Sequence, residues 1–271
     1  MPKKSTSKVT YENNPFFVAS NGITLLFNSA RGMAVLLLVL SLINFFTNPR
    51  SSDDKPDKLW NDVVHTVTPW TVGDWALALG SGLVIGLAFI MVSSLIAGAA
   101  AHTSYKLSRG EEVKLSNAFR VAFDNLWGFI WLQLIIFVKI VLWSLLLIVP
   151  GIVMAFRYSL AGTAFFDERK NFRGNDAVKE SLRLTKGAWF TTFASNMLLN
   201  LLSFGVISNV VSTGVNAVLY RQFGDLGDKK KPDAHWLSWL TLVLPFILLI
   251  FFIVLVISIV VGIAIGFSFS K

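Results

Sequence analysis

Two basic residues lie inside apolar segments, where a charge must be solvated, paired or neutralised. Lys139 stands about twelve residues into the apolar stretch 127–149, and Arg157 follows Pro150-Gly151 by about two helical turns. An ammonium group near the middle of a bilayer is costly unless it finds polar partners. A guanidinium beside a helix break could bind a lipid phosphate or cap the carbonyls that the break exposes. Both residues are therefore candidates for an intramembrane polar or lipid-binding site.

Four asparagines in the later apolar segments belong to the same candidate site: Asn196, Asn200, Asn209 and Asn216. Buried amides usually hold transmembrane helices together through hydrogen bonds, and a substrate path is the alternative. The same two readings stay open for Lys139, whose partners would be Gln133, one of these asparagines or main-chain carbonyls. For Arg157 the structural reading is favoured.

The residue types that catalysis would need do not come together in the sequence. The chain contains no cysteine, which excludes disulfides, thiolate nucleophiles and Cys-based metal sites. His65, His102 and His235 are scattered over polar segments, and the interiors of the apolar segments hold no acidic residue. The motifs HExxH and GxSxG and a Gly-rich phosphate loop are missing. We therefore expect no enzymatic activity, no cofactor and no metal.

The elements that carry the candidate residues are apolar segments long enough to cross a bilayer. The chain has 271 residues, of which 54% are hydrophobic and 15% charged, and its mean hydropathy is +0.62. Soluble domains contain about 25% charged residues. The run WLTLVLPFILLIFFIVLVISIVVGIAIGFSF exceeds the roughly 20 residues of one crossing. These features predict an all-α, polytopic transmembrane helical bundle.

Six apolar segments form the predicted core of this bundle: 32–46, 74–101, 127–149, 152–166, 188–204 and 205–220. A C-terminal seventh segment begins at Trp236, and Pro245 would divide it into an interfacial stretch and a crossing. Pro150-Gly151 is expected to turn the chain between the third and fourth segments. No charge separates the fifth from the sixth, so both pairs are predicted to be tight hairpins.

Amphipathic interfacial helices are expected between the crossings. Residues 15–30, 112–123 and 176–187 place apolar and polar side chains at helical spacing. Asn175 or Asp176 would cap the last of these helices. The chain then divides into a cytoplasmic tail with an interfacial helix (1–30), a six-span membrane module (31–235) and a C-terminal transmembrane segment (236–271).

Positive charge predicts the orientation. The chain has 24 Lys and Arg against 16 Asp and Glu, and the basic residues gather in the N-terminal tail and in the segments 102–125, 167–187 and 221–235. Because Lys and Arg collect in cytoplasmic loops, we expect a multi-pass cell-membrane protein with a cytoplasmic N-terminus. Anionic membrane lipids are then natural partners, and nucleic acid is not needed to explain the charge. A candidate basic surface comprises Lys179, Arg183 and Lys186.

Small residues recur along one side of the second apolar segment: Ala78, Gly82, Gly86, Ser94 and Gly98. Such a stripe lets another helix approach closely. Packing within the chain is favoured over a seam between copies, although a homo-oligomer or a membrane-protein partner stays open.

A family resemblance rests on IVPGIVMAFRYSLA, the acidic pair Asp167-Glu168 and AVKESLRLTKG. Together they resemble the glycerophosphoryl diester phosphodiesterase membrane domain and related small integral membrane families of unknown function. EVKLSNAFR and VLYRQF fit as well, so the resemblance covers roughly residues 15–225. Its motif comprises Pro150-Gly151-Ile152, Arg157-Tyr158, Ser181, Leu184, Thr185 and Gly187.

The resemblance implies a fold without an activity. In the named family the membrane module accompanies a separate catalytic domain, and the polar segments here have no room for a barrel of about 250 residues. The seventh segment departs from the six-span pattern. We therefore expect a non-enzymatic scaffold or envelope-associated subunit whose basic cytoplasmic face binds lipid or a partner protein. The alternative is a small transporter or permease component with a polar path near Lys139 and Arg157.

Overall fold

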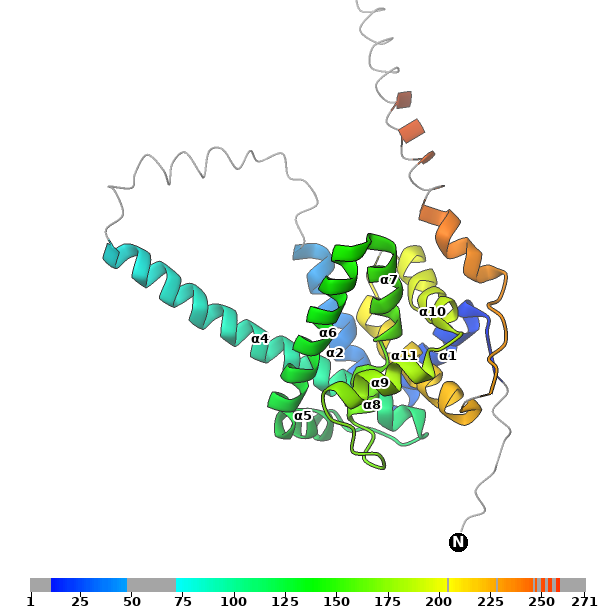
Figure 1. Ribbon diagram of the computed structural model, residues 1–271, viewed down its shortest axis with the longest axis horizontal. Helices are drawn as coiled ribbons and strands as arrows, with labels where there is room; N and C mark the ends of the chain where they lie inside the picture. Colours follow the sequence, from blue (N-terminus) through cyan, green and yellow to red (C-terminus); the bar gives the residue numbers. More distant parts are fainter. Residues whose placement is uncertain are drawn as a thin grey trace, which may run out of the picture.

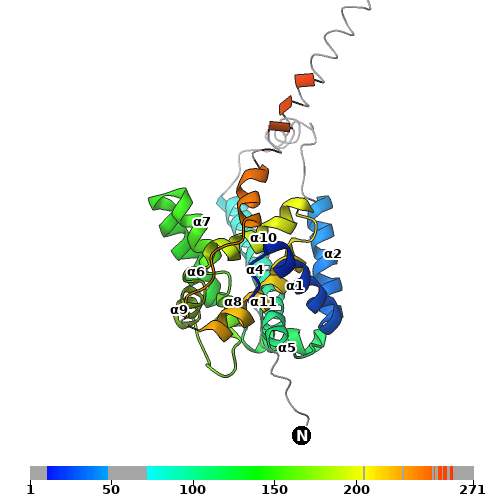
Figure 2. The ribbon, with the colours of Figure 1, turned by 90° about the vertical axis from the view of Figure 1, so that its right-hand side faces the viewer.

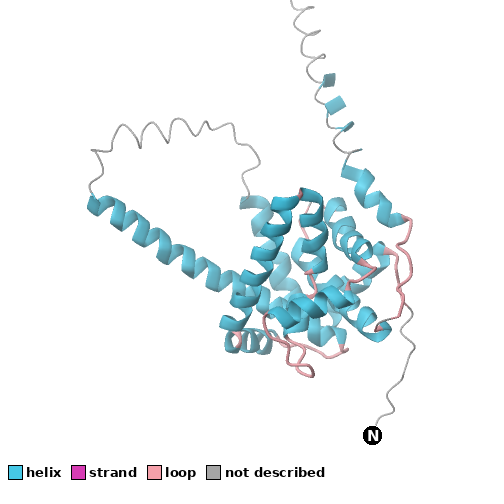
Figure 3. Ribbon diagram, in the orientation of Figure 1, coloured by secondary structure: helices cyan, strands magenta, loops and turns pink. Residues whose placement is uncertain are grey.

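The computed structural model describes residues 11–47, 72–203, 205–227, 229–245 and isolated positions between 247 and 258. Within these ranges every regular element is a helix (Figure 3), so the all-α prediction is confirmed. The segment 48–71 and most of the predicted seventh crossing lie outside the described residues. The helices are α1 (Pro15–Ser29), α2 (Arg31–Thr47), α4 (Val72–Ser108), α5 (Leu115–Asp124), α6 (Leu126–Leu146), α7 (Ile148–Arg157), α8 (Ala161–Phe165), α9 (Asn175–Leu184), α10 (Trp189–Leu202) and α11 (Ser208–Leu226).

Three segments of the described chain are long and apolar enough to cross a membrane. They are Leu79–Ser108, Leu126–Leu146 and Ile148–Phe165. α2 is a shorter apolar helix of 17 residues, and it matches the first predicted crossing to within one residue at each end. These segments are consistent with a multi-pass membrane protein. α10 and α11, which correspond to the fifth and sixth predicted crossings, are not among the three.

α4 continues beyond the point where the sequence pattern ended it. The predicted crossing stops at Ala101, whereas the helix runs through the polar residues that follow, as far as Ser108. These residues remain helical because they are buried and satisfied: Thr103 donates to the carbonyl of Ala99 at 2.8 Å, and Ser104 to that of Ala100 at 3.0 Å. Between Leu79 and Val92, α4 exposes its apolar side chains and extends away from the other helices (Figure 1).

α1 packs inside the bundle against α11. Gly22 of α1 meets Gly214 of α11, and a Cβ atom at position 22 would lie 2.5 Å from the carbonyl carbon of Gly214. Val18, Ala19 and Leu26 are fully buried on the same side of α1. The expected helix is therefore present, and one of its faces belongs to the core. Figure 2 shows α1 next to α11.

The predicted hairpin of the third and fourth segments is present, but its break lies earlier than expected. A single extended residue, Leu147, separates α6 from α7. Pro150 and Gly151 lie in the first turn of α7, where a proline removes no helical hydrogen bond. A Cβ atom at Gly151 would clash with Ser144. The Pro-Gly pair thus lies inside the first turn of α7, where Gly151 lets α7 approach α6, and it does not itself turn the chain.

The second hairpin joins α10 to α11. Gly205, between these helices, has φ +80°, a left-handed conformation that glycine adopts without strain. After α11, residues 237–245 are helical, as expected for the interfacial stretch that precedes the predicted seventh crossing. Trp239 of this segment packs its ring against Phe190 of α10, with the centroids 5.0 Å apart.

Candidate functional site

Lys139 forms a hydrogen bond with a residue that the sequence did not suggest as its partner. Its Nζ donates a 2.5 Å hydrogen bond to Oδ1 of Asn175, the first residue of α9. Gln133, one of the expected partners, instead accepts from the hydroxyl of Ser94 at 2.8 Å. The prediction was wrong because α9 folds back beside α6, which brings a polar helix end within reach of the lysine (Figure 1).

The prediction that Asn175 or Asp176 caps α9 was wrong. The N-cap position is Gly174, with φ +48°, and no side chain caps the first turn. The apolar face predicted for this helix is present, with Ala177, Val178 and Leu184 buried. The side chain of Asn175 accepts from Lys139, so its polar group serves the contact with α6.

Arg157 is attached to the C-terminal half of α9. Its Nη2 donates to the carbonyl oxygen of Leu182 at 3.3 Å. In return, the Arg157 carbonyl accepts from the hydroxyls of Ser181 at 2.7 Å and Thr185 at 3.2 Å. We call these four residues the α7–α9 contact. The carbonyl that Arg157 binds belongs to α9 and not to the break before α7, which corrects the expected capping role.

Lys231 binds the end of α9 as well. Its Nζ donates to the carbonyl of Leu184 and, at 3.2 Å, to that of Lys186. The last carbonyls of a helix lack helical partners and carry partial negative charge, so a buried cation is favourable there. Lys231 is only 7% exposed. Sequence reasoning missed it because it ends a run of three lysines typical of a solvated loop.

The predicted basic surface lies on and just after α9, and ion pairs neutralise part of it. Lys179 pairs with Asp176 at 3.1 Å, and Arg183 pairs with Glu180 at 2.8 Å. Lys186 is exposed. Arg183 lowers the pKa of Glu180, burial of the carboxyl acts in the opposite direction, and Lys170 lowers it further. The pKa of Glu180 therefore lies below its ordinary value, and its charge is retained in the fold.

Asp167 forms a second buried ionic contact, between the segment after α8 and α11. The carboxylate is 0% exposed and accepts from Nε of Arg169 at 3.1 Å and from the hydroxyl of Tyr220 at 2.9 Å. Burial alone would raise the pKa of Asp167, but the hydrogen bonds from Arg169 and Tyr220 outweigh it and hold the pKa below its ordinary value. Asp167 is thus an ionised structural group.

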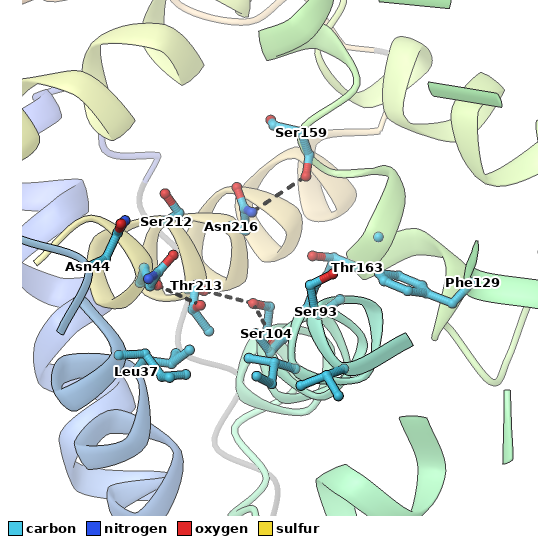
Figure 4. A pocket seen from close by; sticks show the side chains of 18 of the residues that line it. Leu37, Asn44, Ser93, Ser104, Phe129, Ser159, Thr163, Ser212, Thr213 and Asn216 are labelled. Carbon is cyan, nitrogen blue, oxygen red and sulfur yellow. Dashed lines mark hydrogen bonds between the residues drawn. The ribbon is translucent and has the colours of Figure 1, made fainter. Parts of the chain in front are cut away.

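The four asparagines do not form one cluster. Asn196 and Asn200 each donate to the main-chain carbonyl four residues earlier in α10, at 2.9 and 2.6 Å. Asn209 instead joins α11 to α2, with Nδ2 3.0 Å from the hydroxyl of Ser41. Asn209 and Asn216 both line a cavity of about 750 Å³ between α2, α4 and α11. Figure 4 shows Asn216 there. Lys139 and Arg157 are not among the lining residues.

The described histidines lie apart from one another. His102 is buried in α4 with its ring 5.6 Å from that of Phe166. His235 accepts from the main-chain N–H of Leu237 at 3.2 Å, and His65 lies outside the described residues. Over the described ranges, no three His, Asp or Glu side chains are placed to hold a metal ion.

Comparison with known proteins gives no matching family model, no matching curated protein and no matching solved structure. The resemblance to the glycerophosphoryl diester phosphodiesterase membrane domain therefore stays a prediction. The structure does bring together residues of the motif that carried it, because Arg157, Ser181 and Thr185 meet in the α7–α9 contact.

Proposed function

We propose that this chain is a non-enzymatic multi-pass protein of the cell membrane, a scaffold or envelope-associated subunit whose basic cytoplasmic face binds anionic lipid head groups. The observation that supports this function is the separation of charged from apolar surface. The segments 106–124 and 166–186, which include the end of α4, α5 and α9, form one end of the molecule (Figures 1 and 2), and they hold most of the described charged side chains. The first part of α4 and the tip of the α6–α7 hairpin expose apolar side chains instead.

The proposed topology has six core spans within residues 31–235 and a seventh at the C-terminus. α10 and α11 would complete the six, although they are less apolar than the three candidate spans. Their burial supports this assignment, because helices that face other helices need fewer lipid-facing apolar residues. Val211 and Val215 of α11 and Ala194 of α10 are fully buried. The basic end of the bundle would face the cytoplasm.

The electrostatics favour a reversible contact with lipid. The segment 167–187 has six basic and four acidic residues, and Lys179 and Lys186 are exposed. An exposed ion pair such as Lys179–Asp176 contributes little energy, so it competes weakly with a lipid contact. Each Lys or Arg near an anionic surface contributes about 1 kcal/mol, and salt screens this attraction. We therefore expect a contact of moderate, salt-sensitive affinity.

The transport alternative has less support. A polar path would need Lys139 and Arg157 to line a common space, but each is bound to a different part of α9. Lys139 binds Asn175, and Arg157 binds Leu182. Both long side chains thus attach α9 to the α6–α7 hairpin, which supports a structural role for the pair.

Lipid retention after purification tests the proposed function. The full chain would be extracted in mild detergent, and native mass spectrometry would identify everything that stays bound. The double variant Lys179→Glu, Lys186→Glu should retain about tenfold less anionic lipid than the wild type. Arg183 is left intact because it pairs with the buried Glu180.

The double variant Lys179→Arg, Lys186→Arg keeps the charge and is the matched control. It should retain anionic lipid as the wild type does. Equal lipid retention in the charge-reversed protein would contradict binding through this face. A stoichiometric protein found in place of lipid would instead favour a subunit of a larger assembly.

A further inference from the structure

The cavity between α2, α4 and α11 lies among the apolar helices of the bundle. All three candidate spans, Leu79–Ser108, Leu126–Leu146 and Ile148–Phe165, contribute residues to its lining. Its volume of about 750 Å³ falls within the roughly 300–1,000 Å³ of ordinary small-molecule sites. The cavity can therefore hold a small molecule or the head-group region of a lipid.

The cavity has two chemically different walls. The apolar wall is formed by Leu37, Leu40, Phe89, Val92, Ile96 and Phe129. The polar wall, shown in Figure 4, includes Ser93 and Ser104 of α4 and Ser212, Thr213 and Asn216 of α11. None of the described lining residues carries a charge.

Three hydroxyl protons of the polar wall are already used inside the protein. Ser93 donates to the carbonyl of Ile90 at 3.1 Å. Ser104 donates to the carbonyl of Thr213 at 2.8 Å, and the Thr213 hydroxyl donates to the carbonyl of Asn209 at 2.8 Å. A hydroxyl has one proton and two lone pairs. The oxygens of these residues therefore offer acceptors to a ligand.

Asn216 adds an acceptor that has no partner. Its Nδ2 donates to the carbonyl of Ser159 at 3.5 Å, whereas its Oδ1 is buried without a hydrogen-bond partner among the described residues. Leaving a buried acceptor unsatisfied is unfavourable, so a ligand that donates a hydrogen bond to it is favoured. The polar wall thus offers acceptors to a hydrogen-bond donor of the ligand.

The uncharged lining restricts the kind of polar group that the ligand can carry. An ammonium group would find no opposite charge on the described lining, and an unpaired charge at membrane depth is costly. A phosphate or carboxylate would likewise meet no opposite charge on the described lining. A neutral hydroxyl avoids both costs. The apolar wall fits hydrocarbon, and Phe89 and Val92, which are 74% and 58% exposed, carry this wall to the apolar surface of α4.

We propose that this cavity binds an uncharged, hydroxyl-bearing lipid of the diacylglycerol type. Its hydroxyl is directed to Asn216, Thr213 and Ser104, and its hydrocarbon lies along Leu37 and Phe89. This inference goes beyond the proposed contact with anionic head groups and does not depend on it, because the cavity and the basic face share no residue. The two proposals can therefore fail separately.

Equilibrium binding of labelled dioctanoylglycerol to the full chain in phosphatidylcholine nanodiscs tests this site. The wild type should bind saturably, with one lipid per chain. Ser212→Phe places a ring in the cavity from α11 and should weaken binding at least tenfold. Val84→Phe, on an exposed part of α4 outside the cavity lining, is the matched control and should bind as the wild type does.

Thr213→Val is a second variant that keeps the shape of a lining side chain and removes only a hydroxyl that the proposal directs to the ligand. This variant should weaken binding about threefold to tenfold, the value of one hydrogen bond. It tests the site even if the Ser212→Phe protein does not accumulate.

Three results would overturn the proposal. The first is the absence of saturable binding, and the second is wild-type affinity in both cavity variants. The third is competition by free glycerol or by phosphatidic acid as effective as that by unlabelled dioctanoylglycerol. Glycerol competition would indicate a water-soluble polyol site, and phosphatidic acid competition would remove the requirement for a neutral head group.

Discussion

Ser181 and Arg157 are joined by a 2.7 Å hydrogen bond from the Ser181 hydroxyl to the Arg157 carbonyl oxygen. The bond connects α9 to the end of α7, and Ser181 is completely buried. Ser181→Ala leaves the carbonyl of Arg157 with the longer bond from Thr185. We expect this variant to lose about 1–2 kcal/mol of unfolding free energy, measured by thermal unfolding in detergent.

Ser20→Ala is the control for this variant. Its hydroxyl donates to the carbonyl of Phe17 within α1 and lies in an exposed hydrogen bond. Surface substitutions of this kind usually change the free energy of unfolding by less than about 0.5 kcal/mol. An unfolding curve of Ser181→Ala that coincides with that of Ser20→Ala would show that the α7–α9 contact contributes little.

The crossing of Gly22 with Gly214 gives a second prediction. A methyl group on Gly22 would meet the main chain of Gly214, which cannot move aside as a flexible side chain can. Gly22→Ala should therefore cost about 1–3 kcal/mol or more through overpacking. Gly86→Ala is the matched control, since nothing lies within 4 Å of the added Cβ atom, and it should be neutral or more stable by up to about 1 kcal/mol. Equal melting temperatures for the two variants would contradict the close crossing.

Lys231 and Lys230 are neighbours in sequence with different roles. Lys231 is buried and donates to the carbonyls at the end of α9, whereas Lys230 is exposed. Lys231→Met removes charged hydrogen bonds worth about 1.5–3 kcal/mol and should lower the melting temperature clearly. Lys230→Met should leave it nearly unchanged. Faster hydrogen exchange at the last turn of α9 in Lys231→Met alone would locate the effect.

Low pH should destabilise the fold through the charged end of the molecule. The pKa values of Asp167 and Glu180 are lower in the folded chain than their ordinary values. Each carboxylate therefore contributes stability that is present above its unfolded pKa of about 4, and this stability is lost as the pH falls through the folded pKa. The melting temperature should fall below about pH 4.

Asp167→Asn tests the origin of this acid sensitivity. The variant should be less stable at pH 7 and should lose part of the decline below about pH 4. Glu112→Gln, at an exposed position, serves as the control and should follow the wild-type curve. An Asp167→Asn protein with the full wild-type acid transition would exclude Asp167 as a source of the sensitivity.

The helices themselves could be predicted well from the sequence. α2 and α9 lie within one or two residues of their expected starts, because runs of apolar residues and helical periodicity are local properties of the chain. The predicted helix boundaries were wrong where packing against a neighbouring helix determines where a helix ends. α4 continues through His102 and Ser104 because other helices bury these polar residues, and α7 begins at Ile148 with the Pro-Gly pair inside its first turn.

The candidate site was less predictable than the helices. The sequence by itself determined the apolar segments, the basic end and the absence of cysteine, since these follow from residue types and their order. Only the tertiary structure decided that Lys139 binds Asn175, that Lys231 binds the end of α9, and that Asn209 and Asn216 share a cavity while Asn196 and Asn200 do not. The physical reason is that a hydrogen bond or a cavity depends on which helices lie side by side, and residues that are distant in the chain become neighbours only when the bundle packs.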